Sequence, residues 1–182
     1  MLIIWILIAL GILALWAMFT YNGLVTLKHR TDEAWADIDV QLKRRHDLIP
    51  NLIATVKGYA AHESGTFQTV IEARNAALGA KNMTDRVQTE NMLSNTLKNL
   101  FALTEAYPDL KANQNFLELQ RDLTDTEDKL QAARRFYNGN VRDFKIKLEV
   151  FPTQLIGNLL GFKPLEYFEI TATEKALPQV RF

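Results

Sequence analysis

Residues 1–27 read MLIIWILIALGILALWAMFTYNGLVTL and contain no charged side chain. A helix rises ~1.5 Å per residue, so about 20 apolar residues cross the ~30 Å hydrocarbon layer of a bilayer. The segment from Leu2 to Tyr21 is long enough to do so. Its aromatic residues stand near its two ends, where interfacial side chains are enriched: Trp5, and then Trp16, Phe19 and Tyr21. The stretch therefore predicts a transmembrane helix.

A cleaved signal peptide is the alternative for such a segment. It needs a positively charged start and small residues at the cleavage site. Here the first basic residue is Lys28, and residues 19–22 are bulky. We therefore expect an uncleaved anchor. Because Lys28 and Arg30 follow the span and nothing basic precedes it, the positive-inside rule predicts an external amino terminus and a cytoplasmic remainder.

Beyond the anchor, apolar residues recur at spacings of three and four, which is typical of one face of a helix. The first seam consists of Trp35, Ile38, Leu42, Ile49, Leu52, Val56 and Tyr59. The longest consists of Phe116, Leu119, Leu123, Thr126, Leu130, Ala133, Tyr137, Val141, Phe144 and Leu148. Two shorter helices are expected between them, the second capped by Thr84. No segment alternates with period two, and the loops are short. We therefore predict an all-α protein: a transmembrane helix followed by an antiparallel up-down four-helix bundle.

These patterns divide the chain into three parts. Residues 1–27 form the anchor and a short juxtamembrane segment, and residues 28–150 form the bundle. Residues 151–182 hold three of the five prolines and five aromatic residues. We interpret this tail as a strap packed at the membrane-proximal base of the bundle. The alternative is an element that contacts the membrane surface or a partner.

Composition and motifs exclude several classes of function. The 21 Lys+Arg balance 21 Asp+Glu, so no basic patch favours nucleic acid as a partner. The absence of Cys excludes disulfides, thiolate metal sites and a cysteine nucleophile. None of the three His has a Glu three residues before it, as di-iron bundles require. We expect no catalytic residues, no cofactor, no metal and no small-molecule substrate.

Arg45 stands at the skipped place in the first seam, which predicts that it is at least partly buried. A desolvated guanidinium needs a carboxylate beside it. Counting along an antiparallel fourth helix brings Arg45 within about two turns of Glu127. We therefore expect a pair with Glu127, or alternatively with Asp85 or Glu90, in a buried polar network that includes Arg134. The other possibility is that the Arg45 side chain extends along its stem to solvent.

Arg45 also belongs to the basic run from Lys43 to His46. On a continuous helix this run would stand ~25 Å above the membrane, beyond a Debye length of ~8–10 Å. We therefore interpret the run as a solvated helix face and not as a site for anionic lipid.

Several stretches closely resemble the LemA family of bacterial membrane proteins. They are residues 34–52, 56–60, 62–63, 73–74, 105–112, 119–120, 126–127, 133–138, 151–152 and 167–168. Phe144 and Asp128 depart from the family's usual residues. The resemblance implies a single-pass protein of the bacterial inner membrane with a cytoplasmic helical bundle. It supplies no catalytic residues. Some relatives take part in forming organelle membranes in magnetotactic bacteria.

Our leading hypothesis is a non-enzymatic scaffold or adaptor, anchored in the bilayer, that binds another membrane protein or copies of itself. The alternative is a ligand-binding or enzymatic bundle with an internal pocket formed by Arg45, Glu63, Glu105, Glu127 and Arg134. A signalling stalk ranks last, because neither a signalling domain nor a second span accompanies the bundle.

Overall fold

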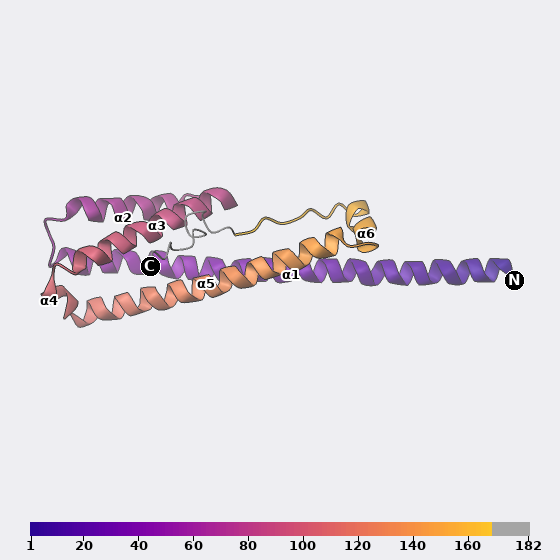
Figure 1. Ribbon diagram of the computed structural model, residues 1–182, viewed down its shortest axis with the longest axis horizontal. Helices are drawn as coiled ribbons and strands as arrows, with labels where there is room; N and C mark the ends of the chain where they lie inside the picture. The colour runs from indigo at the N-terminus through magenta and orange to yellow at the C-terminus, as the bar shows by residue number, and fades with distance from the viewer. Residues whose placement is uncertain (169–182) are drawn as a thin grey trace, which may run out of the picture. The chain divides into compact units, whose positions relative to one another are not determined.

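The computed structural model describes residues 1–168 (Figure 1). This part of the chain is helical and contains no strand, so the all-α prediction is confirmed for it. The helices are α1 (Leu2–Lys57), α2 (Ser64–Leu78), α3 (Met83–Thr104), α4 (Pro108–Lys111), α5 (Gln114–Glu149) and α6 (Thr153–Leu159). The last part of the predicted tail, residues 169–182 with Phe182, lies outside the described residues.

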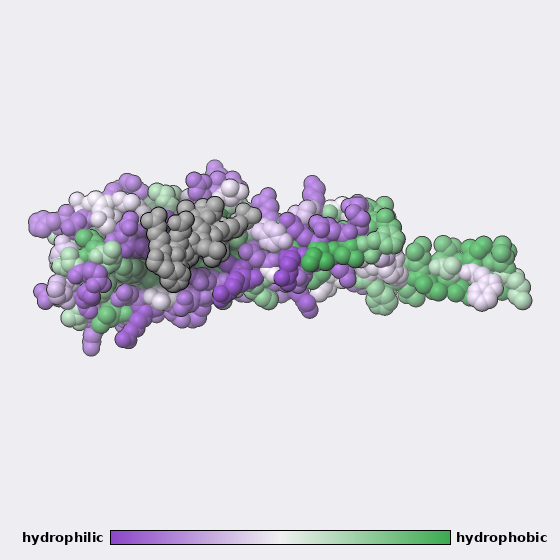
Figure 2. Space-filling model, viewed as in Figure 1, coloured by the Kyte–Doolittle hydropathy of each residue, from purple (hydrophilic) through white to green (hydrophobic). Residues whose placement is uncertain are grey.

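Helix α1 contains 56 residues and begins with the apolar stretch identified in the sequence. Within residues 1–168 it is the one helix that is long and apolar enough to cross a membrane. Its most apolar window is not buried inside the protein. Apolar residues cover this part of α1 (Figure 2). The amino-terminal part of α1 is therefore a candidate membrane span.

Between α1 and α5 the structure has three helices where two were predicted, because Pro108, which suits the first turn of a helix, begins the short helix α4. A second difference lies at the start of α3. The residue that caps α3 is Asn82, whose Oδ1 accepts a hydrogen bond from the backbone N–H of Asp85 at 2.8 Å. The prediction that Thr84 is the cap was wrong, because α3 already begins at Met83. Asparagine is as good a capping residue as serine or threonine, since its side-chain oxygen reaches the N–H groups of the first turn.

The described residues fall into two compact units, and the boundary between them passes through both α1 and α5. Unit 1 contains residues 1–38 and 132–167, and unit 2 contains residues 39–131 and Phe168. The core of unit 2 is formed by side chains from α1 to α5 and from the α1–α2 loop. They are Ile49, Leu52, Val56, Ala60, Phe67, Val70, Ala73, Ala77, Leu93, Leu97, Leu100, Leu110, Phe116 and Leu123.

Unit 1 joins α1 to the last part of α5. Its buried apolar residues are Leu24, Ala34, Ile38, Tyr137, Val141 and Phe144. The rings of Trp35 and Tyr137 meet edge to face, with centroids 5.4 Å apart. After α6, the extended segment 162–167 lies against α5, since the Tyr137 hydroxyl donates a hydrogen bond to the Glu166 carbonyl at 2.9 Å. The Lys145 ammonium also lies 4.4 Å from the centroid of the Tyr167 ring.

Candidate functional site

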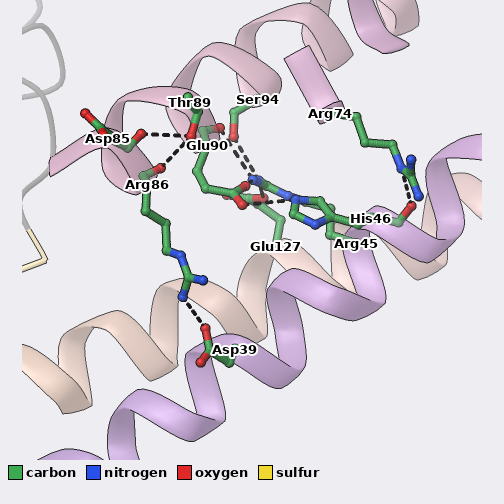
Figure 3. Close-up of polar contacts among 10 residues, drawn as sticks. All are labelled: Asp39, Arg45, His46, Arg74, Asp85, Arg86, Thr89, Glu90, Ser94 and Glu127. Carbon is green, nitrogen blue, oxygen red and sulfur yellow. Dashed lines mark hydrogen bonds and ion pairs between the residues drawn. The ribbon is translucent and has the colours of Figure 1, made fainter. Parts of the chain in front are cut away.

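A buried cluster of charged side chains lies inside unit 2, and Arg45 of α1 is at its centre (Figure 3). The Arg45 side chain is 1% exposed, so it does not extend to solvent. Its Nη1 donates to Oε2 of Glu127 on α5 and to Oγ of Ser94 on α3, both at 2.9 Å. Its Nη2 donates to the carboxylate of Glu90 on α3. The structure thus brings Arg45 to Glu127, and also to Glu90.

Glu90 is as deeply buried as Arg45, with a side chain 1% exposed. Its second carboxylate oxygen, Oε1, lies 3.0 Å from Nε2 of His46 on α1. Burial alone would raise the pKa of Glu90, but the adjacent His46 ring and the Arg45 guanidinium together outweigh it. The pKa of Glu90 is therefore lowered, and the carboxylate stays ionised inside the protein.

The basic run from Lys43 to His46 is divided between two environments. Lys43 and Arg44 are exposed, whereas Arg45 and His46 are buried. The interpretation of the whole run as a solvated face was therefore wrong. On a helix, consecutive residues are ~100° apart, so a four-residue run turns through all sides and part of it must face the core. Arg45 and His46 lie on the side that carries Leu42 and Ile49.

A second contact compensates for a proline within α1. Pro50 has no N–H, so it cannot donate to the carbonyl of His46 four residues earlier. Nε of Arg74 on α2 donates to this carbonyl instead, at 2.8 Å. The position of Pro50 in the sequence shows which carbonyl is left free, but the side chain that binds it is known only from the structure. Through Arg74, helix α2 is held to the turn of α1 that carries Arg45.

We expect Arg74→Ala to lower the free energy of unfolding by about 1–2 kcal/mol, because it leaves a partly buried carbonyl without its donor. In the background of Pro50→Ala, whose N–H can bind the His46 carbonyl, the same change should cost less than half as much. Urea unfolding of the four variants in mild detergent measures the difference. Equal costs in both backgrounds would contradict this account of Arg74.

A further ion pair joins α1 and α3 near the cluster. Arg86, in the first turn of α3, donates to the carboxylate of Asp39 on α1, and both side chains are partly exposed. Together with Arg45 and Arg74, this pair means that polar contacts in unit 2 connect α1 to each of α2, α3 and α5.

The lowered pKa of Glu90 predicts a pH dependence of stability. A carboxylate whose pKa is lower in the folded state stabilises the protein above its unfolded pKa, near 4.3, and this contribution is lost as the pH falls through the folded value. The difference in unfolding free energy between the wild type and Glu90→Gln should therefore be largest at neutral pH and shrink between pH 5 and the acid limit. Urea titrations at each pH measure it. A difference independent of pH would contradict the assignment.

Two other candidate residues, Glu63 and Glu105, make polar contacts elsewhere in unit 2. Glu63 accepts a hydrogen bond from the Tyr107 hydroxyl at 3.3 Å. The exposed carboxylate of Glu105 pairs with Lys111 at 2.5 Å, because it lies at the end of α3 where the chain turns to solvent. Arg134 is buried in unit 1.

The sequence contains one signal for the burial of Glu90, which is its place on the apolar seam of α3. Glu90 stands three residues before Leu93, so it continues the inward seam of α3 through Leu97 and Leu100. A charged residue on such a seam requires a charged partner on a neighbouring seam. Arg45 is likewise a charged residue on the inward apolar seam of α1.

In the cluster, the positive charge of Arg45 is compensated by the carboxylates of Glu90 and Glu127. The guanidinium contacts two carboxylates and a hydroxyl, and its fixed donor geometry suits such bidentate surroundings. Within residues 1–168, no group of three or more His, Cys, Asp or Glu side chains is arranged to hold a metal ion. The best-attested role of a buried ionic group of this kind is to select one register between packed helices.

Comparison with known proteins gives a consistent set of relatives. The model of the LemA family matches residues 34–182, which include the whole cluster. The magnetosome protein MamQ of Magnetospirillum gryphiswaldense is 23% identical over 194 residues, covering 90% of this chain and 71% of that protein. Magnetosome protein MamQ 2 of Paramagnetospirillum magneticum is 23% identical over 178 residues, covering 84% and 65%. Protein LemA of Metamycoplasma hominis is 23% identical over 155 residues, covering 85% and 71%.

Proposed function

This chain belongs to the LemA family, and from that membership and the buried cluster we propose that it is a membrane-anchored, non-catalytic scaffold or adaptor. In this proposal the helices form an antiparallel up-down bundle. The bundle presents an outer surface to another membrane protein or to a second copy of the chain. The relatives named as magnetosome proteins support a structural role of this kind.

The observation that carries the proposal is the continuity of α1. This one helix contains the candidate membrane span near its start and three core residues of unit 2, Ile49, Leu52 and Val56, near its end. No loop separates the anchor from the folded part, as it would in a protein tethered by a flexible linker. The charged groups of the cluster are bound to one another, which favours a structural role for them.

We further propose that the protein lies in the bacterial inner membrane with its amino terminus outside and its bundle in the cytoplasm. Lys28 and Arg30, which directly follow the span, support this orientation. The chain has no Cys, so a single cysteine introduced at the exposed position Lys98 is a unique label. Blocking of Lys98→Cys in intact spheroplasts by a membrane-impermeant maleimide would contradict the orientation. Protection until the cells are lysed is the expected result.

Purification of the full-length chain in mild detergent tests the scaffold role. We expect a discrete partner, or a homo-oligomer, to remain with the protein at stoichiometric amounts. The matched control is a variant with charge reversals at the exposed positions Lys98 and Glu118, which leave the core unchanged. Recovery of a folded monomer alone, identical for the wild type and the control, would contradict the proposal.

A further inference from the structure

Helix α6 in unit 1 has its large apolar side chains outside and its small residues inside. Leu155 and Leu159 are 58% and 79% exposed, whereas Thr153 and Gly157 are buried. A Cβ atom on Gly157 would lie 2.9 Å from Cδ2 of Leu148, so the small face of α6 is the one that packs closely on α5. An amphipathic helix in water has the opposite arrangement, with its leucines toward the core.

The exposed leucines belong to a larger apolar surface, which we call the apolar foot. It consists of Val150, Phe151, Leu155, Leu159 and Leu160, each at least half exposed. No charged residue occurs between Val150 and Phe162, which is the longest uncharged stretch after Leu27. The surface over α6 is correspondingly green in Figure 2. Single exposed apolar residues are ordinary, but a concentration of this kind marks a binding surface.

The position of the foot in unit 1 identifies its occupant. The Phe162 ring, which follows α6, meets the Tyr21 ring edge to face with centroids 6.2 Å apart. It also meets the Phe144 ring, at 6.3 Å. Tyr21 ends the apolar stretch of α1, and aromatic residues at this point of a span lie at the membrane–water interface. The carboxyl-terminal flank of α6 therefore lies beside the residue where the span leaves the hydrocarbon.

Exposed charged residues border the foot in the sequence: Glu149 directly precedes Val150, and basic residues are found beside Phe162 and the span. Lys163 follows Phe162, and Arg30 follows the span, and both are exposed. Basic residues next to an apolar helix face favour contact with anionic headgroups. The uncharged stretch itself carries no carboxylate that such a surface would repel.

We propose that the apolar foot inserts into the headgroup region of the same bilayer that α1 crosses. The protein then has two contacts with lipid: a span, and a peripheral helix seated ~5–10 Å into the headgroup and acyl boundary. The second contact fixes how deeply α1 sits and which side of unit 1 faces the membrane. This inference rests on the proposed anchoring by α1.

Single-cysteine labelling of the full-length chain tests the foot. A nitrobenzoxadiazole fluorophore is attached to Leu159→Cys on the foot, to Leu13→Cys in the span and to Arg135→Cys on an exposed site of α5. All three positions are exposed, so the labels leave the core of the protein intact. Each protein is reconstituted in vesicles of phosphatidylcholine and phosphatidylglycerol, with and without nitroxide-labelled acyl chains as quenchers.

We expect nitroxide-labelled lipid to lower the fluorescence about two-fold at both Leu13 and Leu159 and to leave the label at Arg135 unchanged. Quenching at Leu13 with none at Leu159 would contradict the insertion of the apolar foot but would agree with the proposed anchoring by α1. No quenching at Leu13 would overturn the proposed anchoring, and the foot with it. If the label at Leu159 were not quenched by lipid, and its fluorescence changed only as the protein concentration rose, a second copy of the chain would be the occupant. That result would also overturn the proposal.

Discussion

Replacing Arg45 by alanine is expected to lower the free energy of unfolding by about 3–5 kcal/mol, the cost of leaving a buried charge without its partner. Glu90 is 1% exposed and would lose its guanidinium partner and border a cavity. Glu127, whose side chain is 35% exposed, would regain contact with water. Urea unfolding of the full-length protein in mild detergent, followed by circular dichroism, measures the loss.

The matched control for Arg45→Ala is Lys129→Ala, which breaks the ion pair with Asp125 at the surface of α5. Both side chains of this surface pair are about half exposed, so losing the pair should lower the free energy of unfolding by less than ~0.5 kcal/mol. The double variant Arg45→Met with Glu90→Leu should recover most of the stability lost in Arg45→Ala, because it leaves neither charge unpaired. If Arg45→Ala cost no more than Lys129→Ala, the cluster would not hold unit 2 together.

The second large effect concerns the anchor. The paired change Leu10→Arg and Leu13→Arg places two charges near the middle of the apolar stretch. At ~2.5–3.5 kcal/mol for each arginine, insertion should become about 5–7 kcal/mol less favourable. We expect the protein to leave the membrane pellet and appear in the supernatant after an alkaline wash.

The control for the anchor is the same pair of positions changed to alanine, which is close to neutral for insertion. Leu10 and Leu13 are both more than half exposed, so neither pair of substitutions removes packing inside the protein. Retention of the arginine variant in the pellet, equal to that of the alanine variant, would show that α1 does not anchor the protein through this segment.

The helices themselves were predictable, because their signal is local. The seam from Phe116 to Leu148 predicted a helix of about 35 residues, and α5 runs from Gln114 to Glu149. Where two residues of similar capping ability stand close together, as Asn82 and Thr84 do, the sequence does not decide between them.

The contacts of the cluster were less predictable, because periodicity identifies the inward face of a helix and not the helix it meets. The skipped place at Arg45 indicated burial, and the structure places that side chain inside unit 2. Choosing among Glu127, Glu90 and Asp85 required the arrangement of three helices in space. The structure gives Arg45 two of these partners at once and buries His46 beside them.

We propose above that this protein acts by binding another protein at the surface of its helices. In-cell crosslinking tests it directly, with a photoreactive residue at the exposed positions Lys98 and Glu118 of the full-length chain, followed by mass spectrometry. We expect a discrete crosslinked partner or a ladder of self-crosslinks. Efficient incorporation that yielded only uncrosslinked monomer at both positions would contradict it.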